Sequence, residues 1–220
     1  MKKKLLAFVL CIALLAVAAV GFTLAYFTDT DEVTNTFTIG NVSIELLESK
    51  LHRTNDNATD EAIVSDAEGY ADYLAEAGKN LMPGVNVNKA PYIRNTGSNR
   101  AYVRLRMLVP ADLWPYLGCT YTDEAYTDGS IAQTVELEKV TIDGVEYVQY
   151  AFVYNEALEA GEMTYWPAFW QFKLLETVTS EDVAALALTD ATFNIILQAD
   201  AIQADTFATA ADAFAAFDAQ

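Results

Sequence analysis

Alternating apolar and polar positions along the chain predict a framework of β-strands. The clearest alternation lies between Ala101 and Val109, where every second residue is apolar and the opposite face carries Tyr102, Arg104 and Arg106. Weaker alternation marks further expected strands at residues 36–47, 85–91, 135–154, 165–175 and 193–201. The pair Asp143-Gly144, in the middle of 135–154, is typical of the tight turn of a β-hairpin.

Glycine and asparagine residues mark two further turns between these strands. Gly84 follows Pro83, and Gly97 lies inside an Asn-Thr-Gly-Ser-Asn stretch. We expect both glycines to adopt turn conformations that other residues resist. The side chains of Asn95 and Asn99 can bond the backbone around the second turn. Arg104 lies on the face of its strand opposite the core, so we expect it to find a carboxylate or carbonyl partner.

Helical periodicity replaces the alternation in three places. Residues 60–79 are rich in Ala, Glu and Asp, with apolar positions at helical spacing, and predict one or two short helices. Ser180 is a suitable N-cap for a helix at 181–188. Thr206 or Thr209 is expected to cap an alanine-rich helix at about 206–218. We interpret residues 110–134 as a loop.

These elements predict a mostly β fold without regular alternation of strands and helices. Such a pattern is typical of an antiparallel sandwich, and we expect a jelly-roll sandwich with short helical excursions and a C-terminal helix. One domain is expected from residue 26 to residue 220, with a helical insertion at about 50–80.

The N-terminus has the pattern of an export signal. Lys2 to Lys4 precede an uninterrupted apolar or small-residue run, and Thr23-Leu24-Ala25 places small residues where a signal peptidase cleaves. We therefore expect residues 1–25 to be a signal peptide, removed between Ala25 and Tyr26, and the protein to be secreted or held at the cell surface. The alternative is an uncleaved membrane anchor, and we expect no other contact with a membrane.

The charge balance restricts the partners. The chain has 13 Lys+Arg against 31 Asp+Glu, a net charge of -18, and loss of the three N-terminal lysines would leave 10 against 31, or -21. Such a surface excludes nucleic-acid binding, which needs clustered cations. Three acidic clusters could bind calcium weakly, although none has EF-hand spacing. They are Asn55-Asp56-Asn57 with Asp60-Glu61, Asp29 to Glu32, and Asp123-Glu124 with Asp128.

Catalytic chemistry has few candidate residues. His52 is the only histidine, so a zinc-binding HExxH helix cannot form, and no Gly-x-Ser-x-Gly motif accompanies it. Cys119 has no supporting signature, and it is the one cysteine after residue 25, so no internal disulfide is expected there. We interpret His52 as an exposed loop residue and expect no enzyme activity and no cofactor.

Three segments of the chain carry a family resemblance. They are Leu24 to Val42 with its Tyr26-Phe27-Thr28-Asp29 start, Met82 to Arg104 with its Asn95–Asn99 turn, and Leu197 to Asp205 with its Gln-Ala-Asp turn. In this order and spacing they resemble the TasA/camelysin family of secreted proteins, which a SipW-type signal peptidase processes. The resemblance implies a jelly-roll sandwich. For the best-known members it also implies extracellular fibres of the biofilm matrix, in which the N-terminal segment of one subunit adds as a strand to the next.

On this interpretation the protein is a structural component that associates with itself into a homopolymer. The donor strand would carry Phe27, Val33 and Phe37 among polar residues. Two alternatives stay open. One is a camelysin-like surface metallopeptidase, and the other is a monomeric surface module that binds through an aromatic cleft around Trp114, Trp166 and Trp170.

Overall fold

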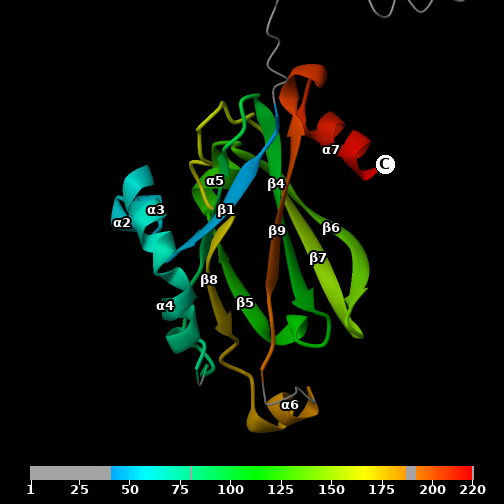
Figure 1. Ribbon diagram of the computed structural model, residues 1–220. Coiled ribbons are helices and arrows are strands. Elements are labelled where there is room, and N and C mark those ends of the chain that lie inside the picture. Colours follow the sequence, from blue (N-terminus) through cyan, green and yellow to red (C-terminus); the bar gives the residue numbers. More distant parts are fainter. Residues whose placement is uncertain (1–40, 80, 187–191, 220) are drawn as a thin grey trace, which may run out of the picture. The chain divides into compact units, whose positions relative to one another are not determined.

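The computed structural model describes residues 41–79, 81–186 and 192–219, and its strands pair antiparallel throughout. The predicted mostly β fold with a C-terminal helix is confirmed (Figure 1). The strands are β1 (Ile44–Ser49), β2 (Val87–Asn88), β3 (Ala90–Asn95), β4 (Ala101–Pro110), β5 (Leu117–Tyr121), β6 (Ile131–Ile142), β7 (Val145–Tyr154), β8 (Phe169–Leu174) and β9 (Ile196–Gln203). The helices are α2 (Arg53–Asp56), α3 (Asp60–Glu68), α4 (Tyr70–Ala77), α5 (Asp123–Thr127), α6 (Ser180–Ala185) and α7 (Ala210–Asp218), with 3₁₀ turns η1 (Trp114–Tyr116) and η3 (Ala204–Thr206).

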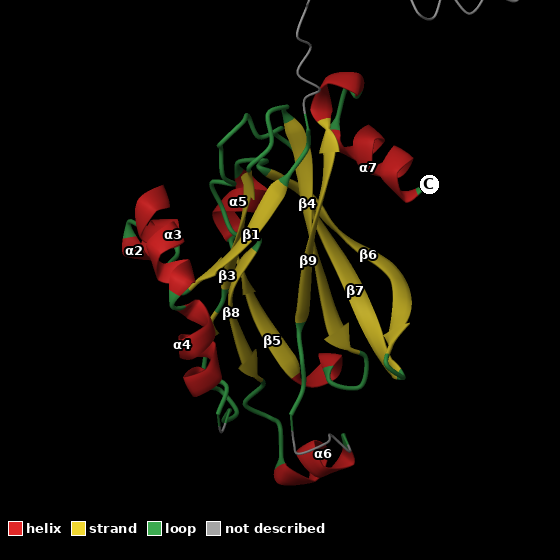
Figure 2. Ribbon diagram, viewed as in Figure 1, coloured by secondary structure: helices red, strands yellow, loops and turns green. Residues whose placement is uncertain are grey.

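Three sheets share one hydrophobic core. Their strand orders are β6-β7-β4-β9, β2-β8-β5 and β1-β3. Figure 2 labels all of these strands except β2. The inward face of β4 is the predicted apolar row, and Val103, Leu105 and Met107 are fully buried there. Ile93 of β3 and Phe169 of β8 belong to the same buried cluster, so all three sheets contribute to it.

The β6–β7 hairpin forms as its sequence predicts. Asp143 and Gly144 both have positive φ, at 50° and 83°, which is the conformation that this two-residue turn requires. The expected apolar face of the last strand is also confirmed. Leu197, Ala199 and Ala201 lie opposite the buried residues of β4 and pack against the core.

The helical excursion and the terminal helix form near their expected positions. Thr59 caps α3 by accepting a hydrogen bond from the backbone of Ala62. Helix α7 begins at Ala210, later than expected, because Thr209 rather than Thr206 accepts from the backbone nitrogen of Asp212. None of the helices within the described ranges is long and apolar enough to cross a membrane.

Three predictions about local structure were wrong. The expected loop at 110–134 contains η1, β5, α5 and the start of β6, because β5 gains a partner in β8 that lies far away in the sequence. The strand expected from residue 165 begins at Phe169, after Pro167, which has no N–H for a ladder. The cap of α6 is Thr179 and not Ser180, since Thr179 forms a reciprocal capping box with Asp182.

Candidate functional site: an unpaired strand edge and its groove

Strand β1 has one paired and one unpaired edge. It pairs with β3 from Ile44↔Asn95 to Ser49↔Ala90, and the carbonyl of Ser43 accepts from the backbone nitrogen of Thr96 at 2.8 Å. The N–H and C=O groups of successive residues point to opposite edges of a strand. Since those of Ser43 face β3, those of Ile44, Leu46 and Glu48 face the other edge. Among the described residues no strand pairs there.

Strand β9 approaches that same edge without pairing with it. Cα atoms of β1 and β9 come within 8 Å of one another, yet β9 pairs only with β4 in the described sheets. In Figure 2 the two strands approach at one end and separate toward the other. Two unpaired strand edges therefore border one gap, which we call the β1–β9 gap.

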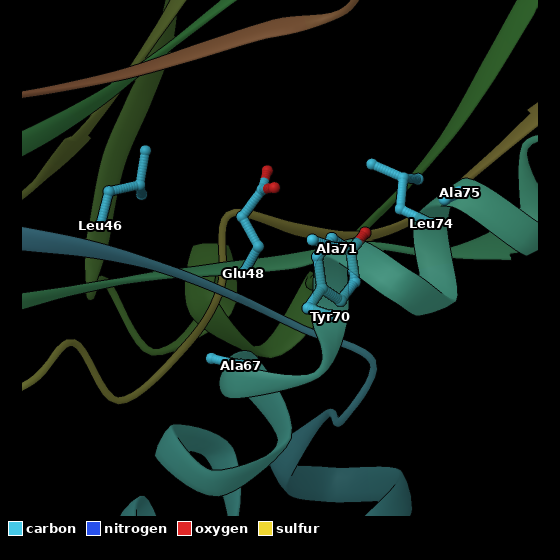
Figure 3. A pocket seen from close by; sticks show the side chains of 7 residues that line it. All are labelled: Leu46, Glu48, Ala67, Tyr70, Ala71, Leu74 and Ala75. Carbon is cyan, nitrogen blue, oxygen red and sulfur yellow. The ribbon is translucent and has the colours of Figure 1, made fainter.

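A groove lies between β1 and the helical excursion. It is a cavity of about 500 Å³, and Figure 3 shows the side chains of β1 and of the helices around it. Its lining residues are Leu46 and Glu48 from β1 and Ala67, Tyr70, Ala71, Leu74 and Ala75 from α3 and α4. A second cavity of about 310 Å³ shares Leu46, Glu48 and Ala67 with it. Small side chains on the helices therefore leave room beside the free edge of β1.

The apolar side chains along the β1–β9 gap are only partly covered. On β4, Val103, Leu105 and Met107 have no exposed surface. The apolar residues that border the gap are packed on the same core but remain partly exposed; they are Ile44, Leu46, Leu197, Ala199 and Ala201. Burying such surface is favourable, so a further strand in the gap would gain apolar contacts as well as backbone hydrogen bonds.

One carboxylate lies in the groove, and a lysine neutralises it. Glu48 is the one charged residue among those lining the larger cavity, and its carboxylate accepts a hydrogen bond from Nζ of Lys89. The same ammonium lies 5.4 Å from the ring centre of Tyr70. The hydroxyl of Tyr70 donates to the carbonyl of Asn88 at 3.0 Å, and burial raises the pKa of this hydroxyl. The floor of the groove therefore carries no unpaired charge.

Other sheet edges carry features that discourage pairing. The register of β6 against β7 shifts at two places. Strand β6 also carries the exposed charged residues Glu136, Glu138 and Lys139. The register of β5 against β8 shifts between Thr120 and Tyr121. Bulges and charges are the devices by which proteins protect strand edges. The β1–β3 and β4–β9 ladders that border the gap show no such shift.

The predicted turn residues have structural roles. Gly84 has φ of +80°, as expected. The reason given for Gly97 was wrong: its φ is not positive, but a Cβ there would lie 2.4 Å from the carbonyl oxygen of Asn41. The side chain of Asn95 bonds the turn as expected, since its Nδ2 donates to the carbonyl of Asn99 at 2.8 Å and its Oδ1 accepts from the backbone of Gly97 at 3.0 Å. This turn holds the start of β1 against β3.

Arg104 has the carboxylate partners that its position predicts. Its Nε donates to Asp200 at 2.7 Å, and its two terminal nitrogens donate to Asp218 of α7 at 2.7 and 2.6 Å. Its guanidinium also lies over the rings of Phe214 and Phe217, at 4.7 and 5.2 Å. The outer face of β4 is thus covered by the terminal helix, and Arg104 connects the two.

The expectation that His52 is exposed was wrong. Its side chain is 2% exposed and packs against Trp166 and Trp170, with ring centres 5.9 and 5.3 Å away. Its local sequence is polar, and the burial comes from residues more than a hundred positions later. Trp114 instead packs against Tyr150, with their ring centres 4.9 Å apart. The structure therefore does not bring the three tryptophans into one ring cluster.

The remaining candidate residues divide into two groups. Among the described acidic clusters, Asp56 accepts from the backbone of His52, Asp60 pairs with Arg53, and Asp128 accepts from Trp166. In the part of the chain that the structure describes, no group of three or more His, Cys, Asp or Glu could hold a metal ion. Cys119 is a free, partly buried thiol whose pKa is raised by burial. The cleavage residues Ala25 and Tyr26, the donor-strand residues Phe27, Val33 and Phe37, and the cluster Asp29 to Glu32 lie outside the described residues.

Sequence reasoning did not find the groove. Ala67, Ala71 and Ala75 recur every fourth residue, which is the spacing of one helix face, and this was the available signal. The pairing of that face with the free edge of β1 depends on the fold. Comparisons with protein-family models, with curated proteins and with solved structures gave no match to this chain.

Proposed function

We propose that this chain is a secreted structural protein of the cell surface or biofilm matrix, similar to the TasA/camelysin family. Its subunits would assemble into fibres when the N-terminal segment of one copy adds as a strand to the next. The antiparallel sheets around one core support the finer proposal of a jelly-roll sandwich. One observation carries the functional proposal: two unpaired strand edges border a partly covered apolar gap, and one of these strands, β1, also lines a groove.

The segment from Tyr26 to Phe37 has the length and chemistry to occupy the gap. At about 3.3 Å per residue, it would span roughly 40 Å when extended, whereas the six residues of β1 need about 20 Å. Phe27, Val33 and Phe37 would supply the apolar contacts, and the intervening polar residues would stay in solvent. A strand between two others needs about 10 Å between them, so the added strand would satisfy edge amides of both β1 and β9 only where the two have separated.

The occupant is expected to come from a second copy. The segment leads into β1 within a few residues, so a strand from the same chain would need a tight reversal immediately before β1. A strand from a neighbour needs none. Since donor and acceptor surfaces differ, such contacts do not close on themselves and generate a filament.

Charge would make assembly depend on solution conditions. The segment contributes Asp29, Asp31 and Glu32 to a chain that is already strongly acidic. Protonation of carboxylates, or their neutralisation by calcium, lowers the repulsion between copies. We expect the chain from residue 26 onward to polymerise as the pH falls or as the calcium concentration rises.

The test compares the chain 26–220 with a form that lacks residues 26–36. Light scattering and electron microscopy should show filaments only for the longer form, with both forms folded by circular dichroism. A synthetic peptide of residues 26–37 should bind the shortened form in fluorescence anisotropy. Filaments from the shortened form, or a monomeric longer form under all conditions, would refute the proposal.

A matched pair of variants tests the position of the acceptor site. Ala71 is exposed and lines the groove, so Ala71→Trp should fill it and prevent peptide binding without disturbing the core. Ala215 is an exposed alanine of α7 away from both cavities, and Ala215→Trp should bind the peptide normally. Equal binding by the two variants would show that the segment docks elsewhere.

A further inference from the structure

His52 lies where the helical excursion meets the β2–β8–β5 sheet. It immediately precedes α2, and its backbone carbonyl accepts from the nitrogen of Asp56 at 2.9 Å. Its ring packs against Trp170 of β8 and Trp166 just before that strand. Thr122, the residue between β5 and α5, lies 3.5 Å from Nε2 through its hydroxyl. One imidazole thus contacts two segments that are distant from it in sequence.

The surroundings of this ring favour its neutral form. Within the described part of the chain Nδ1 is buried and has no hydrogen-bond partner, and Nε2 has a long contact of 3.5 Å with the Thr122 hydroxyl. An imidazolium has two N–H donors, so protonation would bury a charge and a donor without an acceptor. Trp166 stacks on the imidazole and Trp170 packs against it at a tilt, and little of the side chain is exposed to water.

The charges near the ring do not reverse this preference. Burial lowers the pKa of His52, and this effect outweighs the opposing influence of Glu124 on α5 and Asp56 on α2. The Asp56 carboxylate already accepts from the backbone nitrogen of His52 at 2.7 Å. Nearby charged groups are engaged. Arg53 pairs with Asp60, donates to the carbonyl of Tyr165 and lies over the ring of that tyrosine, and Asp128 accepts from Trp166.

We propose that His52 is a pH-sensitive contact: its neutral ring helps Arg53 to hold α2 and the start of α3 against the β2–β8–β5 sheet, and its protonation shifts the equilibrium toward release of this segment. The inference goes beyond the proposed function and does not depend on it. The rest of the excursion has its own anchor, because Ile63 of α3 is fully buried among residues of β1 and β3. Release is therefore local and leaves the core strands in place.

The size of the effect follows from linkage. When the segment is released, His52 regains an ordinary pKa of about 6.5. A group with a lowered pKa in the closed state loses its stabilising effect as the pH falls below that ordinary value. Between pH 7.0 and 5.0 the released form can gain at most about 25-fold, the limit set by a pKa of about 6.5 in that form. This window lies above the ordinary titration range of carboxyl groups.

The experiment uses the fact that the chain has one histidine. Proton–carbon NMR of the imidazole reports its titration without assignment ambiguity, and we expect a midpoint below 6.5. Hydrogen exchange, corrected for intrinsic rates, should show protection at Asp56 falling between pH 7.5 and 5.0, by at most about 30-fold. Amides of β4 and β7 should change much less. In His52→Phe, which keeps an aromatic ring without a proton site, protection at Asp56 should not depend on pH in this window.

Each result decides the proposal. A midpoint at or above 6.5 would overturn it, as would pH-independent protection at Asp56 in the unaltered chain. An equal loss of protection in β4 and β7 would show global unfolding and would also overturn it. If His52→Phe does not fold, the imidazole titration and the comparison between Asp56 and the β4 and β7 amides, both in the unaltered chain, still decide.

Discussion

Replacing Arg104 tests how the terminal helix is held on the sheet. In Arg104→Met the side chain keeps its length but loses its charge and its donors. Asp218 then loses both hydrogen bonds from the guanidinium, and Asp200 keeps only Arg106, whose Nη2 donates to it at 2.8 Å. Helix α7 would remain attached through its apolar residues, chiefly Ala210 and Phe214.

The expected loss of stability follows from burial. The side chains of Arg104 and Asp200 are 4% and 7% exposed, so breaking their contact leaves a buried carboxylate with reduced compensation. Breaking a buried ion pair costs roughly 3–5 kcal/mol, and we expect about 3 because Arg106 remains. Asp218 is 48% exposed, so water screens its pairing, and Asp218→Asn should cost only about 1 kcal/mol.

Urea unfolding followed by circular dichroism measures both variants against the unaltered chain, here taken from residue 26. For a domain of this size, about 3 kcal/mol corresponds to a fall in Tm of roughly 6–12 °C. Equal losses in the two variants, or a larger loss in Asp218→Asn, would refute the argument that burial of Arg104 dominates.

The pH dependence of Asp218 gives a second measurement on the same pair. Hydrogen bonds from Arg104 lower the pKa of the Asp218 carboxyl below its ordinary value of 3.8. Its stabilising effect is therefore complete above that value and is lost as the pH falls through the lower folded pKa. In Asp218→Asn this acid-dependent contribution should be absent.

Further predictions concern the turn before β1, catalysis and export. Gly97→Ala should lower the free energy of unfolding by about 2 kcal/mol, because the new Cβ would meet backbone atoms at 2.4 and 2.7 Å. Gly144→Ala is strained by its φ of +83° but lies in open space, so it should cost about 1 kcal/mol in the same urea assay. The reverse order of the two losses would contradict the steric argument. His52→Ala should leave any peptidase activity of a clean preparation unchanged, and loss of a co-purifying activity would count against a non-enzymatic protein. N-terminal sequencing of the secreted form should begin at Tyr26 or Phe27, and a full-length membrane-retained product would exclude cleavage.

The elements that could be predicted are those whose information is local. The apolar residues of β4 form the face that the fold buries, and their two-residue period is evident within the nine residues from Ala101 to Val109. The Asp143-Gly144 turn depends on two residues that tolerate positive φ. Helices α3 and α4 follow from apolar positions at helical spacing and from the cap at Thr59.

The elements that could not be predicted depend on distant partners. Strand β5 contains glycine, cysteine and threonine, a weak pattern, and it becomes a strand through its pairing with β8. His52 sits in a polar stretch, and two tryptophans from the other half of the chain bury it. The groove likewise needs β1 and α4 together, and neither segment alone indicates a cavity.

The environment of Cys119 has a practical consequence for measuring distances between copies. Thiol-directed dyes react with the thiolate, and burial raises the pKa of this thiol, so it is a poor target at neutral pH. It is also the one cysteine after residue 25. A second cysteine introduced beside the hairpin turn, at an exposed strand position as in Thr141→Cys, would therefore take up a dye selectively. Energy transfer between dyes on neighbouring copies would then report the repeat distance along a filament without removal of the native thiol.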